Sequence, residues 1–134
     1  DMEKYYCNSM TNYFKVKKLN NFKAELGRYG AGEGGIDIWE ENGLIALGSY
    51  GSMITLYDEE KDDWIEIFEI LQEHIEDEEV VIIAEAGNEK LRYVTTFAWL
   101  VTKDNVKFVD AVNEVVKDAM RITGKSASDL LPQY

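Results

Sequence analysis

Residues 36–49 read Ile-Asp-Ile-Trp-Glu-Glu-Asn-Gly-Leu-Ile-Ala-Leu-Gly-Ser, so that two apolar runs flank the pair Asn42-Gly43. Asn-Gly between apolar runs is the strongest short signal for a β-hairpin, because both residues tolerate the positive φ of a type I′ turn. The stretch therefore predicts a hairpin with strands at residues 36–41 and 44–49.

Regular apolar spacing predicts the elements on either side of this hairpin. Residues 13–17 alternate at a period of two and predict a short strand, while apolar residues three and four positions apart predict a helix over 19–29. Residues 80–86 and 90–102 predict a second, longer hairpin around Gly87-Asn88-Glu89. Its first arm begins Val-Val-Ile-Ile-Ala, which is apolar throughout and indicates a central strand covered on both faces.

Two further helices are predicted, one over residues 62–76 and one over about 110–122. In the first, an apolar stripe that includes Trp64 is expected to face inward. In the second, Asp110 is the expected N-cap and Gly124 the C-terminal stop. Its expected buried face consists of Val112, Val115, Val116, Ala119 and Met120. The order of elements predicts an α+β fold: a single domain with a mainly antiparallel sheet of two hairpins plus a short N-terminal strand, and about three packed helices.

The length of 134 residues fits one domain. We expect that domain to occupy residues 10–124, with 125–134 as a tail. Residues 1–9 are interpreted as disordered or foreign to the native chain, which would then start at Met2 or Met10. The single cysteine cannot form an internal disulfide, and no secretory signal or long apolar run occurs, so we expect a cytoplasmic location.

The negative charge is concentrated in one part of the chain. The sequence holds 26 acidic and 14 basic residues, a formal net charge of −12. Twelve of the acidic residues and one base, Lys61, lie within residues 58–79, which therefore carry −11 and leave −1 for the rest. A focused negative field attracts basic partners and repels nucleic acid and anionic lipid. We expect a basic protein surface as the partner, with no direct binding of nucleic acid or membrane.

Spacing within the predicted helix over 62–76 brings several carboxylates into one row. They recur at steps of four, three, four and three residues, and a neighbouring aspartate extends the row. The candidate partner-binding residues are Asp62, Glu66, Glu69, Glu73, Glu76 and Asp77, together with Tyr50 as an exposed contact in the loop over 48–52. The alternative interpretation of the row is an ordinary solvated helix face.

Other motifs fail on context, and no catalytic, cofactor-binding or metal-binding residue is predicted. Residues 58–69 follow part of an EF-hand register, but Asp63 stands where the calcium loop needs glycine. Residues 30–35 match the dinucleotide-binding fingerprint letter for letter, yet they follow a helix, whereas that motif follows a strand and opens a helix. His74 is the only histidine, and this single histidine indicates neither a metal site nor a nucleophile–base pair.

Four segments carry a resemblance: Asn-Tyr-Phe-Lys-Val at 12–16, Ile-Asp-Ile-Trp at 36–39, Gly-Ser-Tyr-Gly-Ser at 48–52 and Asn-Glu-Lys-Leu-Arg-Tyr at 88–93. Through them, residues 10–122 resemble small acidic proteins carried by phages and integrative mobile elements of bacteria. The resemblance implies a counter-defence role of the anti-restriction or anti-CRISPR type, in which an acidic surface takes the place of DNA. It assigns no functional residue.

The leading hypothesis is a non-enzymatic acidic binding protein of a mobile element. It would occlude a basic, nucleic-acid-binding surface of a bacterial defence nuclease or effector. The alternatives are an immunity protein or antitoxin against a cognate toxin, a small enzyme or ligand-binding domain, and an accessory protein whose acidic face is only solvated. The sequence leaves the partner, the oligomeric state and the strand order open.

Overall fold

The hairpin at Asn42-Gly43 is present in the computed structural model, which describes residues 5–31, 35–90 and 92–133. Strands β3 (Asp37–Glu41) and β4 (Leu44–Tyr50) pair antiparallel. Asn42 and Gly43 have φ values of 53° and 80°, the positive φ at both central positions that a type I′ turn requires. The prediction from local sequence is confirmed.

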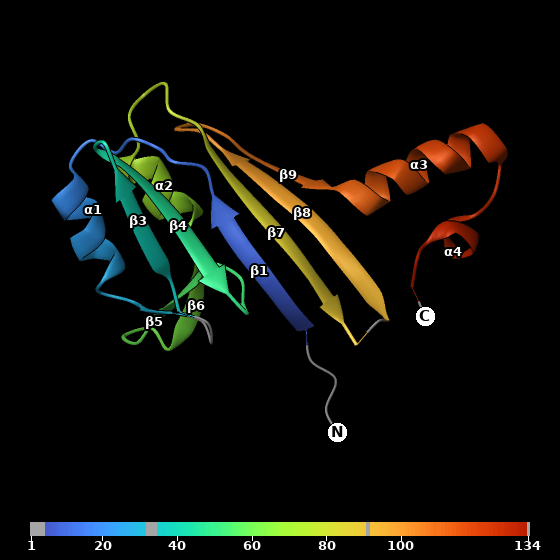
Figure 1. Cartoon of the computed structure of the whole chain (residues 1–134), viewed down its shortest axis with the longest axis horizontal. Coiled ribbons are helices and arrows are strands. Elements are labelled where there is room, and N and C mark those ends of the chain that lie inside the picture. Colours follow the sequence, from blue (N-terminus) through green and yellow to red (C-terminus); the bar gives the residue numbers. More distant parts are fainter. Residues whose placement is uncertain (1–4, 32–34, 91, 134) are drawn as a thin grey trace.

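The described residues form an α+β fold with two antiparallel sheets (Figure 1). The remaining strands are β1 (Tyr5–Thr11), β2 (Gly30–Ala31), β5 (Thr55–Asp58), β6 (Asp63–Glu66), β7 (Val81–Glu89), β8 (Tyr93–Val101) and β9 (Val106–Asp110). The helices are α1 (Leu19–Leu26), α2 (Phe68–His74), α3 (Ala111–Thr123) and α4 (Ala127–Leu130). The larger sheet has the strand order β3-β4-β1-β7-β8-β9, and the smaller one has the order β2-β5-β6. The predicted fold class is confirmed.

Strand β1 lies inside the larger sheet, between β4 and β7. Excluding residues 1–9 from the domain was therefore wrong for 5–9, while 1–4 lie outside the described residues. Cys7 and Ser9 are buried and their neighbours are exposed, so the strand has a period of two. Polar residues at buried positions hide that period in the sequence. By pairing with both neighbours, β1 joins the β3–β4 hairpin to the β7–β8–β9 meander.

Two other strand predictions need correction. Residues 13–17 do not form a strand; Phe14 and Val16 are buried and make isolated bridges to β4 and to the end of α2. The second hairpin forms, but Gly87 lies within β7, opposite Cys7 of β1, and β7 continues to Glu89, which pairs with Tyr93 of β8. A Cβ at Gly87 would lie 2.5 Å from the backbone oxygen of Tyr6. This glycine therefore permits close strand pairing rather than a turn.

Strand β7 is central in the larger sheet but is covered on one face only. Val81 and Ile83 are buried on the face that carries α2, whereas Ile82, between them, is 47% exposed on the other face. The apolar run at the start of β7 was predicted to be covered on both faces of the sheet, and this prediction was wrong. The main core lies on the α2 face, and its fully buried side chains include Phe14, Phe22, Ile45, Leu47, Leu56, Ile67, Leu71, Ile75, Val81 and Val101.

Residues 62–76, predicted as one helix, are divided between strand β6 and helix α2. Strand β6 pairs with β5, and the helix begins only at Phe68. Asp58 supports the reversal between the two strands, because its Oδ1 accepts a hydrogen bond from the backbone N–H of Glu60 at 3.0 Å. Residues 64–67 alternate outward and inward at a period of two, a pattern that the helical interpretation overlooked.

Helix α3 begins and ends as the sequence predicts. The carboxylate of Asp110 accepts a hydrogen bond from the backbone N–H of Asn113 at 3.1 Å, and Gly124 ends the helix at a φ of 73°. Its expected buried face is wrong, because only Val116 is buried. Residues 125–133, expected as part of a tail, include α4, which packs against α3. None of the described helices has the length and apolar character needed to cross a membrane.

Candidate functional site

The carboxylates predicted to form one row lie on four segments: the β5–β6 turn, β6, α2 and the residues after α2. Asp62 occupies the β5–β6 turn with a φ of 51°, Glu66 ends β6, and Glu69 and Glu73 lie on α2. Trp64, predicted to face the core, is exposed and contacts the ring of Tyr57 edge-on. The single helical row was wrong, because the helix begins only at Phe68, so Asp62 and Glu66 precede it and Glu76 follows it.

Three of the predicted contact residues nevertheless come together in a groove bounded by α1, β5, β6 and α2. We call this space, of about 370 Å³, the acidic groove. The carboxylates that line it are Glu25, Asp58, Glu66, Glu69 and Glu73. Lys61 is the cation in the same lining, so five carboxylates and one ammonium leave a local formal charge of −4. Glu25, from α1, was missed because only the tertiary fold brings it here.

One end of the acidic groove is held by a contact between α1 and α2. The Nε2 atom of His74 lies 2.6 Å from Oε1 of Glu25, and its ring packs against Phe22 with a centroid separation of 5.3 Å. Ligand atoms of Glu25, Glu73 and His74 all lie within 4.8 Å of one another. Two carboxylates and an imidazole match the protein ligands of some zinc sites. Within the described part of the chain, these three residues are the group that could hold a metal ion.

The other predicted acidic contacts lie outside the lining of the acidic groove. Glu76 follows α2 and forms an ion pair with Lys15 at 3.7 Å. Asp77 accepts a hydrogen bond from Nζ of Lys103 at 3.0 Å, and that ammonium group lowers the pKa of the Asp77 carboxyl. Asp62 lies at the tip of the β5–β6 hairpin. These carboxylates add to the surrounding negative field, but Glu76 and Asp77 already have cationic partners.

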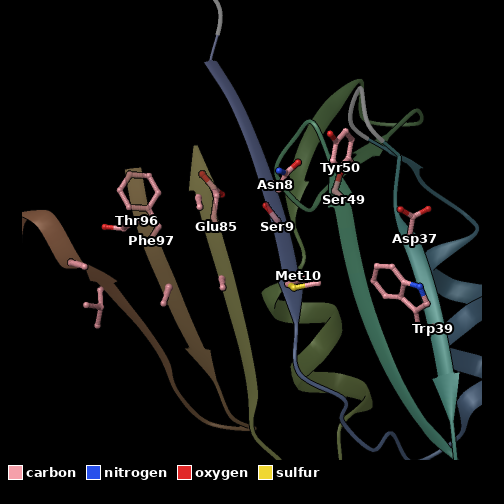
Figure 2. Close-up of a pocket in the computed structure, with 15 residues that line it drawn as sticks. Asn8, Ser9, Met10, Asp37, Trp39, Ser49, Tyr50, Glu85, Thr96 and Phe97 are labelled. Carbon is pink, nitrogen blue, oxygen red and sulfur yellow. The ribbon is translucent and has the colours of Figure 1, made fainter. Parts of the chain in front are cut away.

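Tyr50 lies on a different surface, the face of the larger sheet opposite α2 (Figure 2). Its side chain is 80% exposed, which agrees with the expected exposure. A broad, mainly apolar depression of about 700 Å³ runs over this surface from Trp39 on β3 to the start of α3. We call this surface the open face. Its side chains include Met10, Trp39, Ala46, Gly48, Tyr50, Ile82, Ala84, Ala86, Thr96, Ala98, Leu100 and Val109.

A buried polar cluster between β1, β7 and β8 was also missed. The hydroxyl of Tyr5 donates a hydrogen bond to Oε2 of Glu85 at 2.7 Å and lies 2.5 Å from Oγ1 of Thr95. Burial raises the pKa of the Glu85 carboxyl, while the hydrogen bond from Tyr5 opposes that shift. Burial also raises the pKa of the Cys7 thiol, which makes it a poor nucleophile. The available signal was a glutamate at an inward position of an apolar strand.

Comparison with known proteins gave no likeness that could assign a function. No family model matches the chain, and the searches of curated proteins and of solved structures returned no match. The functional argument therefore rests on the acidic groove and the open face themselves.

Proposed function

We propose that this chain is a non-enzymatic binding protein whose acidic groove receives basic side chains of a partner protein. The observation that carries the proposal is the convergence of Glu25, Asp58, Glu66, Glu69 and Glu73 on one concave surface. Lysine and arginine side chains reach into such a groove and form charge-assisted hydrogen bonds with carboxylates. The net formal charge of −4 on its lining also steers a cationic partner toward the site before contact.

The partner class we favour is a basic, nucleic-acid-binding surface of a bacterial defence nuclease or effector. Such a surface presents lysine and arginine side chains that are spaced to meet phosphates. Carboxylates held on separate strands and helices can meet the same side chains, and the bound protein would then exclude the nucleic acid. The resemblance to small acidic proteins of mobile elements supports this choice.

The test compares two variants of equal net charge in affinity capture from a bacterial lysate, followed by mass spectrometry. The groove variant carries Glu66→Gln, Glu69→Gln and Glu73→Gln. The matched control carries Glu59→Gln, Glu60→Gln and Glu78→Gln, which neutralise three exposed carboxylates of the same acidic segment outside the groove lining. Wild type and control are expected to capture the same basic partner, and the groove variant is expected to lose it.

A second arm adds DNA as a competitor to the captured complex. If the acidic groove covers a nucleic-acid-binding surface, DNA displaces the partner and the partner's nuclease activity falls when this protein binds. Equal capture by the groove variant and the wild type would contradict the role of the groove. Capture that needs the groove but resists DNA would contradict the nuclease class and favour an antitoxin or immunity role.

A further inference from the structure

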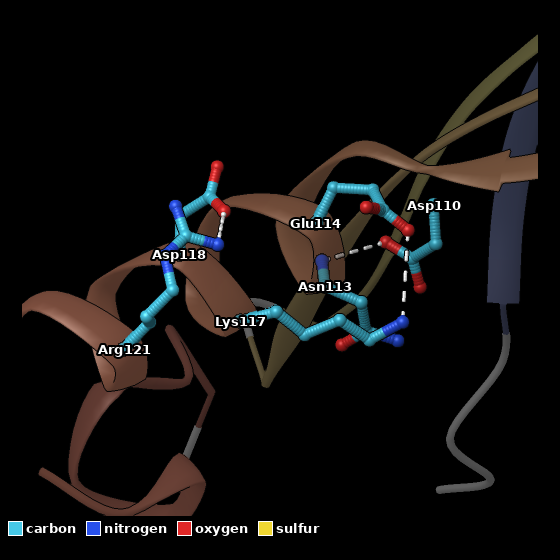
Figure 3. Close-up of polar contacts among 6 residues, drawn as sticks. All are labelled: Asp110, Asn113, Glu114, Lys117, Asp118 and Arg121. Carbon is cyan, nitrogen blue, oxygen red and sulfur yellow. Dashed lines mark hydrogen bonds and ion pairs between the residues drawn. The ribbon is translucent and has the colours of Figure 1, made fainter. Parts of the chain in front are cut away.

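Helix α3 leaves an apolar stripe without cover among the described residues. Val115 and Ile122, two turns apart on one side of the helix, are 68% and 78% exposed. Polar side chains flank this stripe, with Asp118 next to it, and they pair with one another (Figure 3). Lys117 lies 3.6 Å from Glu114, and Arg121 lies 2.9 Å from Asp118. An amphipathic helix of this kind is expected to place its apolar stripe against another surface.

Helix α3 contacts β8 near its start, where Val115 lines a shallow depression with Thr96 and Leu130, but its attachment leaves much of the stripe exposed. Strand β9 ends at Asp110 and the helix begins at Ala111, so no loop separates them. A helix that folds back onto the preceding strand needs a connection of at least a few residues. Helix α3 therefore continues outward beyond the sheet, and the chain then returns past α4 to a bridge between Gln133 and Tyr93 of β8 (Figure 1). We call α3 and α4 the helical arm.

The open face is suited to receive a helix. Small residues, among them Ala84, Ala86 and Ala98, form its floor and allow close approach, while Trp39 bounds it on the β3 side (Figure 2). At about 4.8 Å per strand, the distance from β3 to β9 is roughly 24 Å, and a helix is about 10 Å across. The 13 residues of α3 span about 20 Å, which is shorter than the roughly 30 Å of β7.

The accessible surface, summed over all 134 residues, is larger than that of a compact monomer. It amounts to 8903 Å² for a mass of 15.4 kDa. A compact monomer of this mass is expected to expose about 7,200 Å². The excess, roughly 1,700 Å², exceeds the roughly 800 Å² that each partner buries in an interface of standard size. A second copy of the chain would supply a helix for the open face and a sheet for the stripe of α3.

We propose that the chain forms a two-fold dimer in which the helical arm of each copy lies on the open face of the other. In this dimer the arm of one copy covers the depression of the other, and that depression covers the arm's stripe at Val115 and Ile122. The two-fold axis repeats the same contact once, so no further copies are added. This contact uses neither Glu66, Glu69 nor Glu73, so it is independent of the proposed function. Because each copy carries a net charge of −12, added salt strengthens this association. Added salt is expected to weaken binding of a basic partner at the acidic groove. The opposite response to salt therefore distinguishes partner binding from dimerisation.

The first test is sedimentation equilibrium of the full chain up to about 0.2 mM. The arm variant carries Val115→Asp and Ile122→Asp, both at exposed positions that the monomer fold does not need. The matched control carries Asn113→Asp and Lys117→Gln on the polar side of α3, with the same change in net charge. Wild type and control are expected to be dimers, and the arm variant is expected to dissociate about 100-fold more readily. A monomeric wild type, or a dimeric arm variant, overturns the proposal.

The second test locates the contact by cross-linking with a short bismaleimide. A chain with Ala84→Cys, on the open face, is mixed with a chain with Val115→Cys, on the arm; Cys7 is buried and stays in both. The mixture is expected to give cross-links between residue 84 of one chain and residue 115 of the other, whereas each chain alone is expected to give few cross-linked dimers. Efficient cross-linking of Ala84→Cys with itself would show that two sheets stack directly and would overturn the arm exchange. A small molecule found on the open face of a monomer by native mass spectrometry would also overturn it.

Discussion

Replacing Gly87 by alanine tests the least expected feature of the fold, the pairing of β1 with β7. Gly87 lies opposite Cys7 in that pair. A Cβ at residue 87 would lie 2.5 Å from the backbone oxygen of Tyr6 and 2.6 Å from Cβ of Cys7. Ordinary contacts between such atoms begin near 3.5 Å, so the two strands must separate locally by roughly 1 Å.

Overpacking of this kind costs about 1–3 kcal/mol of unfolding free energy. Alanine also restricts the unfolded chain, which offsets about 0.4–1 kcal/mol. The net loss is therefore about 1–2 kcal/mol, or a fall in Tm of about 3–10 °C for a domain of this size. Thermal unfolding followed by calorimetry measures both quantities.

The matched control is Gly27→Ala. A Cβ at Gly27 would lie 3.5 Å from the backbone oxygen of Lys23, an ordinary contact, and its φ of −69° suits any residue. This variant is expected to be as stable as the wild type, or slightly more so. If Gly87→Ala unfolds at the wild-type temperature, β1 does not lie where the structure places it.

Two further predictions concern the interior. Leu71→Ala, at a fully buried position of α2, is expected to lower the unfolding free energy by about 2–5 kcal/mol in urea denaturation, and a loss below about 1 kcal/mol would mean that α2 does not cover the core. Glu85 has a raised pKa because it is buried, so the folded state retains the proton at a pH where the unfolded state has lost it. The protonated Glu85 carboxyl stabilises the folded state fully below the pKa of an unfolded glutamate, near 4.3. This stabilisation is lost as the pH rises through the higher pKa of the folded state. Glu85→Gln should therefore raise the Tm relative to wild type at neutral pH and lose that advantage in acid; an advantage independent of pH would contradict the assignment.

Local chemistry was a good guide where a few adjacent residues decide the conformation. The Asn42-Gly43 turn and the Asp110 cap formed as predicted, because positive φ and a capping carboxylate are local requirements. The region over 62–76 was ambiguous, because its apolar residues satisfy a helical period and, over 64–67, also a period of two. Pairing with β5 decided in favour of a strand, and such pairing is not visible in the segment itself.

The candidate sites were harder to predict than the elements. Glu66, Glu69 and Glu73 were identified from the concentration of charge, but Glu25 reaches the acidic groove from a segment more than forty residues earlier in the chain. Strand β1 was missed because residues 1–9 were interpreted as lying outside the domain, and because the buried Ser9 weakens the apolar period. The apolar stripe of α3 was visible in the sequence, yet periodicity states only that a face favours cover and not which surface provides it.

The most direct test of the acidic groove is the salt dependence of its binding to an arginine-rich peptide. Titration calorimetry between about 50 and 300 mM NaCl would compare wild type, the Glu66/Glu69/Glu73→Gln variant and the Glu59/Glu60/Glu78→Gln control. Wild type and control are expected to bind with similar affinity, which falls steeply as salt rises. The groove variant is expected to bind weakly at every salt concentration. Equal weakening of both variants would contradict the claim, because binding would then follow net charge rather than the convergence of carboxylates in the groove.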